Sequence, residues 1–314
     1  MPGTHWRKDK CGGSAEKRMT LGVRMKHESL ESRVIVITGA SGGLGRALAH
    51  ALHRQGARLA LLDIDQGAVD GVASVLGERA DVRGWAADVR LLDNLLQVMA
   101  EVRQHFGRID VVIANAGIDA LAPASTIDPS LYERIIDVNL NGVWRTFRAA
   151  LPYVRETQGY LLAMSSMAAF VHLPLQAAYS ASKAGVWALC DSMRLELKHH
   201  GVGIGSAHPA AFPTPMTAAQ TQSAGGKAMK ADTNQGVWKM LSIDAVVARL
   251  VDGIGCREEL IVIPGRNGLV AKAPGLFRGF IERFVFNRQH IRLAVDQAEA
   301  SGDQQHAVSR ARPA

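Results

Sequence analysis

Short apolar runs alternate along this chain with longer stretches in which apolar residues recur every three or four positions. The short runs are rich in Val, Ile and Leu, which is typical of buried β-strands, and the longer spacing indicates amphipathic helices. Strands are predicted at 33–38, 57–62, 83–87, 109–114, 159–165, 202–208 and 260–264. Helices are predicted at 43–56, 66–76, 92–106, 130–156, 179–200 and 243–254.

Regular alternation of strand and helix predicts one doubly wound α/β domain, with a seven-stranded parallel sheet and helices on both faces. We expect this domain at residues 32–265, and ligands of such sheets bind beyond the carboxyl ends of the strands. Residues 210–242 break the alternation with Pro, Gly and scattered apolar positions. Long connections of this kind are often lids over a site, and a variable surface loop is the alternative.

A glycine-rich segment, Thr38-Gly39-Ala40-Ser41-Gly42-Gly43-Leu44-Gly45, directly follows the first predicted strand. Strand, glycine turn and helix form a unit that cradles phosphates, because glycines admit a pyrophosphate close to the backbone and the helix N-terminus offers amide donors. The second predicted strand ends in Asp63, 24 residues after Gly39, where such folds bind the adenosine ribose hydroxyls. The pattern therefore predicts dinucleotide binding.

Tyr179 and Lys183 lie four residues apart, and Ser166 precedes the tyrosine by thirteen residues. On a helix, positions i and i+4 share a face, so we expect the Lys183 ammonium beside the phenol. A neighbouring cation favours the phenolate and lowers the phenol pKa, which makes Tyr179 a candidate general acid/base. Ser166 is the candidate that holds the substrate oxygen.

In these motifs the chain resembles the short-chain dehydrogenase/reductase family, from about Arg33 to Pro264. The resemblance implies a single Rossmann-like domain, an NAD(P)-dependent reaction at a CH-OH group, and a lid over the substrate at about 210–242. It implies these catalytic residues: Asn139, Ser166, Tyr179 and Lys183. It also implies a cofactor site made of Gly39, Ser41, Gly43, Leu44, Gly45, Asp63, Asp88, Val89, Asn115, Ala116, Gly117, Tyr179, Lys183, Pro209 and Thr214.

Two details of the resemblance affect the expected site. Asn139 is implied to anchor a water that relays protons from Lys183 to solvent. The family has Pro-Gly after the sixth strand, whereas this chain has Pro209-Ala210. Because alanine disfavours positive φ, we expect a different path for that loop and a changed placement of the nicotinamide amide, which Thr214 is implied to contact.

The carboxylate of Asp63 favours NAD over NADP, because it accepts hydrogen bonds from the ribose and repels a 2′-phosphate. The leading hypothesis is an oxidoreductase for a secondary alcohol or ketone, with Tyr179 as the general acid/base. The apolar residues of the lid favour a lipophilic substrate. The alternatives are an NADPH-dependent ketoreductase of acyl-chain metabolism and a non-catalytic dinucleotide-binding scaffold.

The net charge of +7 lies in the two ends of the chain. Residues 1–33 and residues 266–314 each contribute +4, so the core carries −1 and offers no basic surface for nucleic acid. Residues 1–31 are polar, and we expect a disordered basic extension without a signal peptide. Three well-separated cysteines favour a reduced, cytoplasmic protein, and no cluster has metal-ligand spacing.

Two further segments have open interpretations. Residues 157–182 lack charged side chains, yet their polar residues favour a buried strand, a loop and a helix start over a membrane span. Residues 275–286 predict an amphipathic helix within a C-terminal region at 266–314 that ends in a polar tail. We expect its apolar face to pack on the body or on a partner subunit, with an anionic membrane surface as the alternative.

The resemblance also implies a homodimer or homotetramer that pairs through the helices at 130–156 and 179–200. Two histidines are further acid/base candidates. His172 lies between the serine and the tyrosine and is a candidate substrate contact, whereas we expect His208, at the end of the sixth strand, to be structural.

Overall fold

A computed structural model describes residues 27–78, 80–214, 217–218, 222, 226–227, 240–284 and 288–301. Within these residues seven strands form one sheet: β1 (Val34–Thr38), β2 (Arg58–Asp63), β3 (Val82–Ala86), β4 (Val111–Ala114), β5 (Tyr160–Met164), β6 (Gly203–Pro209) and β7 (Leu260–Ile263). Every neighbouring pair is parallel, which confirms the predicted doubly wound α/β fold and its seven-stranded parallel sheet.

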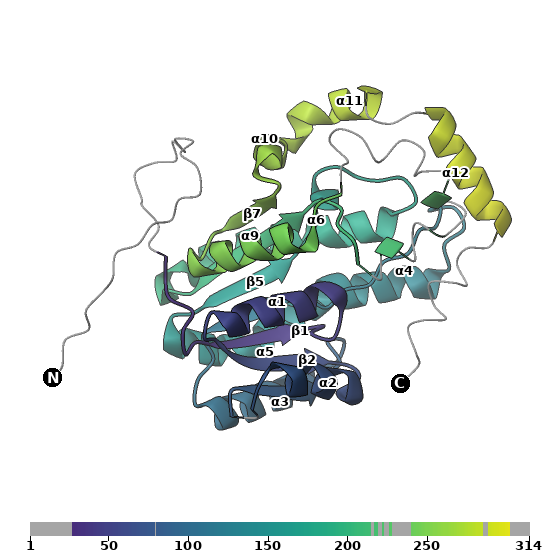
Figure 1. Ribbon diagram of the computed structural model, residues 1–314. Coiled ribbons are helices and arrows are strands. Elements are labelled where there is room, and N and C mark those ends of the chain that lie inside the picture. The colour runs from purple at the N-terminus through teal and green to yellow at the C-terminus, as the bar shows by residue number, and fades with distance from the viewer. Residues whose placement is uncertain are drawn as a thin grey trace.

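The strand order is β3-β2-β1-β4-β5-β6-β7 (Figure 1). The sheet begins with β1, continues outward through β2 to β3, and then adds β4 on the other side of β1. The strand order reverses between β1 and β4, and the loops at the carboxyl ends of these two strands diverge there. A doubly wound sheet binds its ligand at this point.

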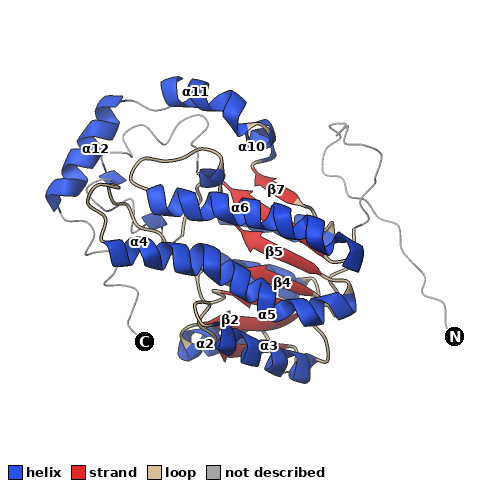
Figure 2. Ribbon diagram, turned by 180° about the vertical axis from the view of Figure 1, so that it is seen from behind, coloured by secondary structure: helices blue, strands red, loops and turns tan. Residues whose placement is uncertain are grey.

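Alternate residues of β1 supply two separate apolar layers, because successive side chains of a strand point to opposite faces. Ile35 and Ile37 join a cluster with α1 (Gly43–Arg54), α2 (Gln66–Leu76) and α9 (Ile243–Gly255). Val34 and Val36 join a second cluster on the other face. Figure 2 shows that face covered by α3 (Leu92–Phe106), α5 (Gly142–Thr157) and α6 (Ala177–Leu197).

The helix predicted at 130–156 is divided by one irregular turn. It comprises α4 (Pro129–Ile136), a π-helical turn (Asp137–Asn141) and α5. Asp128 caps α4, because its side chain accepts hydrogen bonds from the amides of Ser130 and Leu131. A period-3.6 apolar pattern does not reveal a π-turn, which inserts one residue and often marks a functional position.

Of the extension predicted at 1–31, residues 1–26 lie outside the described residues. Residues 27–31 pack against the body. Leu30 is 6% exposed and joins the core, and the amide of Glu28 donates to the carbonyl of Gly255 at 2.8 Å. The packed part of the chain therefore extends beyond the expected boundary at residue 32.

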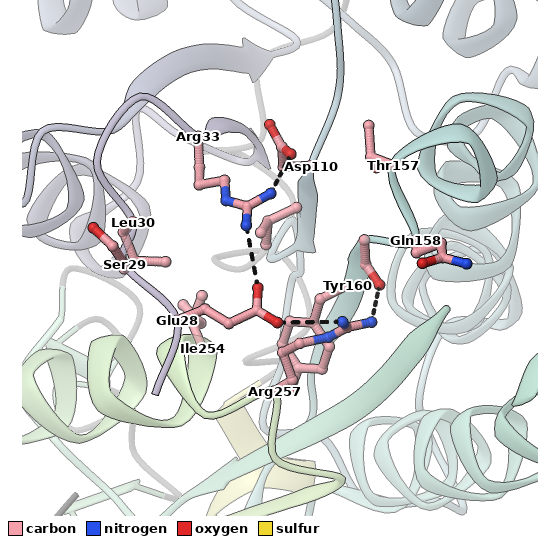
Figure 3. Close-up of a pocket in the computed structure, with 12 residues that line it drawn as sticks. Glu28, Ser29, Leu30, Arg33, Asp110, Thr157, Gln158, Tyr160, Ile254 and Arg257 are labelled. Carbon is pink, nitrogen blue, oxygen red and sulfur yellow. Dashed lines mark hydrogen bonds and ion pairs between the residues drawn. The ribbon is translucent and has the colours of Figure 1, made fainter. Parts of the chain in front are cut away.

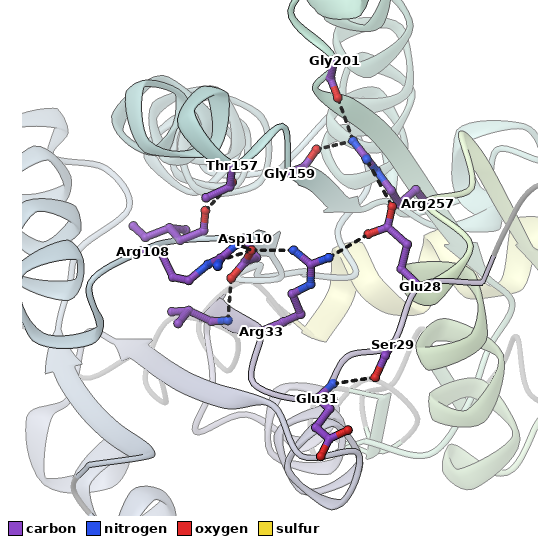
Figure 4. Close-up of polar contacts among 12 residues, drawn as sticks. Glu28, Ser29, Glu31, Arg33, Arg108, Asp110, Thr157, Gly159, Gly201 and Arg257 are labelled. Carbon is purple, nitrogen blue, oxygen red and sulfur yellow. Dashed lines mark hydrogen bonds and ion pairs between the residues drawn. The ribbon is translucent and has the colours of Figure 1, made fainter. Parts of the chain in front are cut away.

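A buried carboxylate ties the amino ends of β1 and β4 together (Figure 4). The side chain of Asp110 is only 3% exposed and accepts hydrogen bonds from the amide of Val34 at 2.9 Å and from Arg33 Nη1 at 2.9 Å. Arg108 Nη2 donates to the same carboxylate at 2.5 Å. A buried charge is tolerated here because three donors satisfy it.

We expect Asp110→Ala to lower the free energy of unfolding by about 3 kcal/mol, because it leaves Arg33 and the Val34 amide without their buried acceptor. Urea denaturation followed by circular dichroism measures this change. Glu156→Ala is the matched control, since it removes an exposed ion pair with Arg103 and should cost less than about 1 kcal/mol. Equal losses for the two variants would contradict the role assigned to Asp110.

A cavity of about 170 Å³ lies beside this network, at the amino ends of the strands (Figure 3). Its lining includes Glu28, Arg33, Tyr160 and Arg257. Arg257 pairs with Glu28 at 3.5 Å and donates to the Gly159 carbonyl at 2.6 Å, so its guanidinium is held by the protein itself. The cavity is on the opposite edge of the sheet from the predicted site, and we assign its charged groups to holding the N-terminal segment.

In the described part of the chain, three α-helices follow β7: α10 (Gly268–Lys272), α11 (Pro274–Phe284) and α12 (Arg288–Ser301). On α11, Leu276 is 79% exposed and Phe280 is 63% exposed, whereas Phe277 and Ile281 are half-buried, so packing on the body also stays a prediction. Contact with a partner subunit or a membrane surface stays a prediction. Among the described residues, no helix combines the length and hydropathy needed to cross a membrane.

Candidate active site

The glycine turn between β1 and α1 is shaped so closely that larger residues do not fit. Gly39 has φ +63°, and a Cβ there would lie 2.8 Å from the Cα of Ala116. A Cβ on Gly45 would lie 2.2 Å from the Gly39 carbonyl oxygen. Helix α1 then begins with exposed or half-buried residues and no acidic side chain in its first turn, so its N-terminal amides are suited to a phosphate.

The turn is fastened to the end of β4. The Thr38 hydroxyl accepts hydrogen bonds from the amides of Asn115 and Ala116, at 3.0 and 3.1 Å. In return the Asn115 side chain donates to the carbonyls of Thr38 and Gly39, at 3.0 and 3.1 Å. Asn115 and Ala116 therefore hold the glycine turn, which we call the glycine cradle, at the point where the strand order reverses.

The carboxylate of Asp63, at the end of β2, faces the glycine turn. Its Oδ2 accepts from the amide of Ser41 at 3.0 Å and from the Ser41 hydroxyl at 2.6 Å, and its Oδ1 accepts from the amide of Ile64 at 2.8 Å. A carboxylate has about four lone-pair directions, so these three donors still leave it able to accept from a ribose hydroxyl. The cradle, the helix N-terminus and Asp63 together fit the adenosine half of a dinucleotide.

Asp88 and Val89 follow the end of β3, on the same edge of the sheet. Asp88 is held by Arg90, whose Nη2 donates to it at 2.6 Å. Burial raises the pKa of Asp88, but the hydrogen bonds and charge of Arg90 outweigh this effect and hold the pKa below its usual value. Val89 is 7% exposed and packs against Gly142, where a Cβ would lie 2.9 Å from a Val89 methyl.

Ala210 lies at the start of the loop after β6. The amide of Ala210 donates to the carbonyl of Ile263 at 2.7 Å, which continues the pairing of β6 and β7 past Pro209. Positive φ among described non-glycine residues occurs elsewhere, so the backbone here suits alanine. Thr214 lies beyond, with its hydroxyl 3.2 Å from that of Thr217. Most of the predicted lid, 215–216, 219–221, 223–225 and 228–239, lies outside the described residues.

Asn139 is fully buried on the π-helical turn, and three hydrogen bonds hold its side chain. Its Oδ1 accepts from the amide of Ile118 at 2.8 Å, and its Nδ2 donates to the Ile118 carbonyl at 2.9 Å and to the Ser182 hydroxyl at 3.1 Å. The side chain thus joins the end of β4 to α6. Both hydrogens of its Nδ2 are engaged, whereas its Oδ1 keeps a second lone pair. The water that Asn139 is implied to anchor stays a prediction.

Ser166, Tyr179 and Lys183 meet between β5 and the first turns of α6. The Ser166 hydroxyl lies close enough to the Tyr179 phenol to lower the phenol pKa, and Lys183 Nζ lies 5.4 Å from the centroid of the Tyr179 ring. Lys183 Nζ also donates to the carbonyl of Met164 at 2.8 Å. A Cβ on Gly117 would lie 3.6 Å from this nitrogen, so the catalytic candidates adjoin the cradle.

The protonation of this pair differs from the sequence-based expectation. Burial raises the pKa of the Tyr179 phenol well above its usual value of 10.0, the charge of Asp119 raises it further, and the Ser166 hydrogen bond lowers it. Burial lowers the pKa of Lys183 to about 8, against an opposing effect of Asp119. We expected the ammonium to lower the phenol pKa; here burial dominates, because it disfavours charge on both groups.

Sequence reasoning missed two polar residues beside the pair. Asp119 lies two residues after Gly117, and Gln176 lies three residues before Tyr179. The Gln176 amide donates to the Asp119 carboxylate, and Gln176 is 7% exposed. Their proximity to motif residues in the sequence was a usable signal, but their contact joins segments 57 residues apart and no local pattern reveals it.

His208 is fully buried and contacts Ser166 and Ser206, which agrees with the predicted structural role. A carbonyl only accepts, so Nδ1 must donate to the Ser166 carbonyl at 3.1 Å, and Nε2 then accepts from the Ser206 hydroxyl at 2.8 Å. Burial lowers the pKa of His208 to about 4, so the ring is neutral near pH 7. His172, the other histidine candidate, is exposed.

Within the described residues, no group of three or more His, Cys, Asp or Glu side chains is placed to hold a metal ion. Cys190 and Cys256 are buried, and neither forms a disulfide within the described residues. Cys11 lies outside the described residues.

The fold and the glycine cradle define a nucleotide-binding α/β protein of the doubly wound class. The family model described as short chain dehydrogenase matches residues 33–225, and the chain belongs to this family of oxidoreductases. The chain is 36% identical over 203 residues to a (-)-trans-carveol dehydrogenase of Rhodococcus erythropolis, covering 60% of this chain and 73% of that protein.

Two further relatives differ in their described activity. An 11-beta-hydroxysteroid dehydrogenase 1A of Arabidopsis thaliana is 32% identical over 242 residues, which cover 75% of this chain and 69% of that protein. An uncharacterized NAD-dependent oxidoreductase of Mycobacterium tuberculosis is 33% identical over 204 residues, covering 60% and 74%. The solved structure of a short chain dehydrogenase/reductase from Burkholderia phymatum, in complex with NAD, shares the fold, with a TM-score of 0.69, 24% identity and coverage of 80% and 96%.

Proposed function

We propose that this protein transfers a hydride between NAD and a secondary alcohol or ketone, with Tyr179 as the general acid/base. One observation carries the proposal: Ser166 and Lys183 lie beside the phenol of Tyr179, and the three adjoin the glycine turn at the point where the strand order reverses. When bound, NAD⁺ would accept the hydride in alcohol oxidation, and NADH would supply it in ketone reduction. The protein would hold the substrate oxygen and move its proton.

In carbonyl reduction, the neutral phenol of Tyr179 donates its proton to the carbonyl oxygen, and the Ser166 hydroxyl donates a hydrogen bond to the same atom. The raised phenol pKa favours this neutral donor. Lys183, held by the Met164 carbonyl, stabilises the phenolate that remains. Alcohol oxidation is the reverse, in which the phenolate accepts the hydroxyl proton while Lys183 keeps its charge.

The choice of NAD rests on Asp63. Its carboxylate lies against the glycine turn, accepting from the Ser41 amide and hydroxyl, so a 2′-phosphate at the neighbouring ribose would meet a negative charge. The name of the Mycobacterium tuberculosis relative, an NAD-dependent oxidoreductase, supports the same choice. NADP is the less favoured cofactor.

We propose a lipophilic secondary alcohol or ketone as the substrate. The carveol and hydroxysteroid names of two relatives describe alcohols of this kind. The test is a panel of secondary alcohols that includes carveol, assayed with NAD by NADH absorbance. Oxidation of at least one lipophilic alcohol supports the proposal, and no turnover of any alcohol or of the matching ketones with NADH would contradict it.

We expect Asp119→Asn to shift the pH profile of alcohol oxidation to lower pH by about one unit. The Asp119 charge raises the pKa of both Tyr179 and Lys183, so its removal lowers both values. The phenolate that oxidation needs then forms at lower pH, and the rising limb of kcat moves with it. Asp93→Asn, an exposed carboxylate on α3, is the control and should leave the profile in place. If the rising limb of kcat keeps its pH or moves to higher pH in Asp119→Asn, the Asp119 charge does not control the pKa of Tyr179.

The two other hypotheses have separate signatures. An NADPH-dependent ketoreductase of acyl-chain metabolism would prefer NADPH and reduce 3-ketoacyl thioesters. A dinucleotide-binding scaffold would bind NADH without turnover. The burial of Lys183 at 4% exposure beside Tyr179 favours an enzyme, because a scaffold gains nothing from a buried ammonium.

We propose further that the protein is a homo-oligomer paired through α5 and α6. Trp144 on α5 is 44% exposed and Leu195 on α6 is 68% exposed, so both helices offer apolar surface to a partner subunit. Light scattering of the intact chain measures the assembly. A mass that stays monomeric at high protein concentration would remove this proposal.

A further inference from the structure

Helix α12 folds back over two loops that flank the candidate active site (Figures 1 and 2). Ala294 is fully buried and Ala298 is 3% exposed, and both pack with Val295 against Leu121 and Leu175. We name these five residues the α12 cluster. Leu121 belongs to the loop after β4, and Leu175 to the segment directly before α6.

The same two loops are joined to each other beneath the helix. The amide of Ala122 donates to the carbonyl of Leu175 at 2.9 Å. Gln176, the residue after Leu175, donates to Asp119, three residues before Ala122. At the outer end, the Ser125 hydroxyl donates to Glu299 of α12 at 2.9 Å. Apolar and polar contacts therefore fasten α12 to the loops at several points.

Leu175 itself shows that its segment is held in place. It has φ +63°, a left-handed conformation that costs free energy for a residue with a branched side chain. Such a conformation persists when the surroundings determine it, and Leu175 is 6% exposed against α12. Gln176 is the N-cap of α6 and Tyr179 lies in the first turn, so the position of Leu175 bears on the placement of the phenol.

We propose that α12 is a strap that positions the substrate side of the active site, with Leu175, Ala294 and Ala298 as positioning residues. The expected effect on turnover rests on the proposed function, whereas the expected effect of α12 on the order of the two loops does not. The glycine turn and Asp63, which form the adenosine side of the cofactor site, lie on other segments, so we expect the strap to act mainly on the substrate side. Alanine at positions 294 and 298 lets the helix approach the loops closely.

The variant Ala294→Glu places a charge in the buried seam, and Ala300→Glu, on the exposed face of the same helix, is its matched control. Hydrogen–deuterium exchange of the intact chain needs no substrate. We expect exchange of the segments 117–126 and 171–178 to rise about tenfold in Ala294→Glu and to stay unchanged in Ala300→Glu. Glu299→Ala, which only removes the bond to Ser125, should raise exchange of 117–126 by about twofold.

Steady-state kinetics distinguish positioning of the substrate side from a purely structural role, because only positioning changes KM without changing NADH binding. With carveol as the probe, we expect KM to rise at least about fivefold in Ala294→Glu while the NADH dissociation constant stays within about twofold. Exchange that rises only within α12, with both loops unchanged, would overturn the strap. If the unaltered chain does not oxidise carveol, exchange alone decides for or against the strap, and only the proposed function is in question.

Discussion

Tyr179→Phe is expected to lower kcat by at least about 10³-fold, because it removes the only proton donor that the proposed mechanism uses at the substrate oxygen. The phenylalanine ring keeps the shape and the face that Lys183 Nζ approaches at 5.4 Å, so the fold and the cofactor site should be unaffected. Steady-state kinetics with an alcohol found in the panel measure the loss. The NADH dissociation constant, from tryptophan fluorescence, should change by less than about twofold.

Tyr132→Phe is the matched control for this change, since Tyr132 is 39% exposed on α4. It should retain full turnover. Undiminished kcat in Tyr179→Phe would show that another group moves the proton, and loss of NADH binding would show that the variant disturbs more than the phenol.

The second large effect is expected at Asp63. Asp63→Asn keeps the shape of the side chain and an acceptor for the Ser41 amide, but removes the charge. We expect the ratio of NADPH to NADH dissociation constants to fall by about 30-fold, because the repulsion of a 2′-phosphate is lost and the hydrogen bonds to the ribose are weakened. Fluorescence titration with each cofactor gives the ratio.

Asp65→Asn controls for the general loss of negative charge in this region. Asp65 caps α2 through a hydrogen bond from the Ala68 amide, so its carboxylate already has a structural role two residues away. The cofactor ratio should change by less than about threefold in this variant. A ratio that is unchanged in Asp63→Asn would place the discrimination between NAD and NADP elsewhere.

The sequence predicted those parts of the molecule that depend on short-range chemistry. Buried β-branched runs predict parallel strands, and the tight turn at Gly39 and Gly45 requires glycine for reasons that the structure makes explicit. The four-residue spacing of Tyr179 and Lys183 placed the ammonium beside the ring as expected. In each case the residue type and its spacing contain the geometric information.

The features missed from the sequence depend on contacts between distant segments. The contact of Asp119 with Gln176 and the packing of Ala294 on Leu175 join residues whose meeting is set by the tertiary fold. The phenol pKa was misjudged for the same reason. One neighbouring cation can be inferred from spacing, whereas the burial that raises the pKa of Tyr179 depends on every element packed around it.

Titration of the intact chain with NADH and with NADPH is the best test of an NAD-dependent oxidoreductase with Asp63 beside the adenosine ribose. Quenching of tryptophan fluorescence reports binding without any knowledge of the substrate. We expect NADH to bind at least about tenfold more tightly than NADPH, because the charge of Asp63 repels the 2′-phosphate. Tighter binding of NADPH, or binding of neither cofactor, would contradict it.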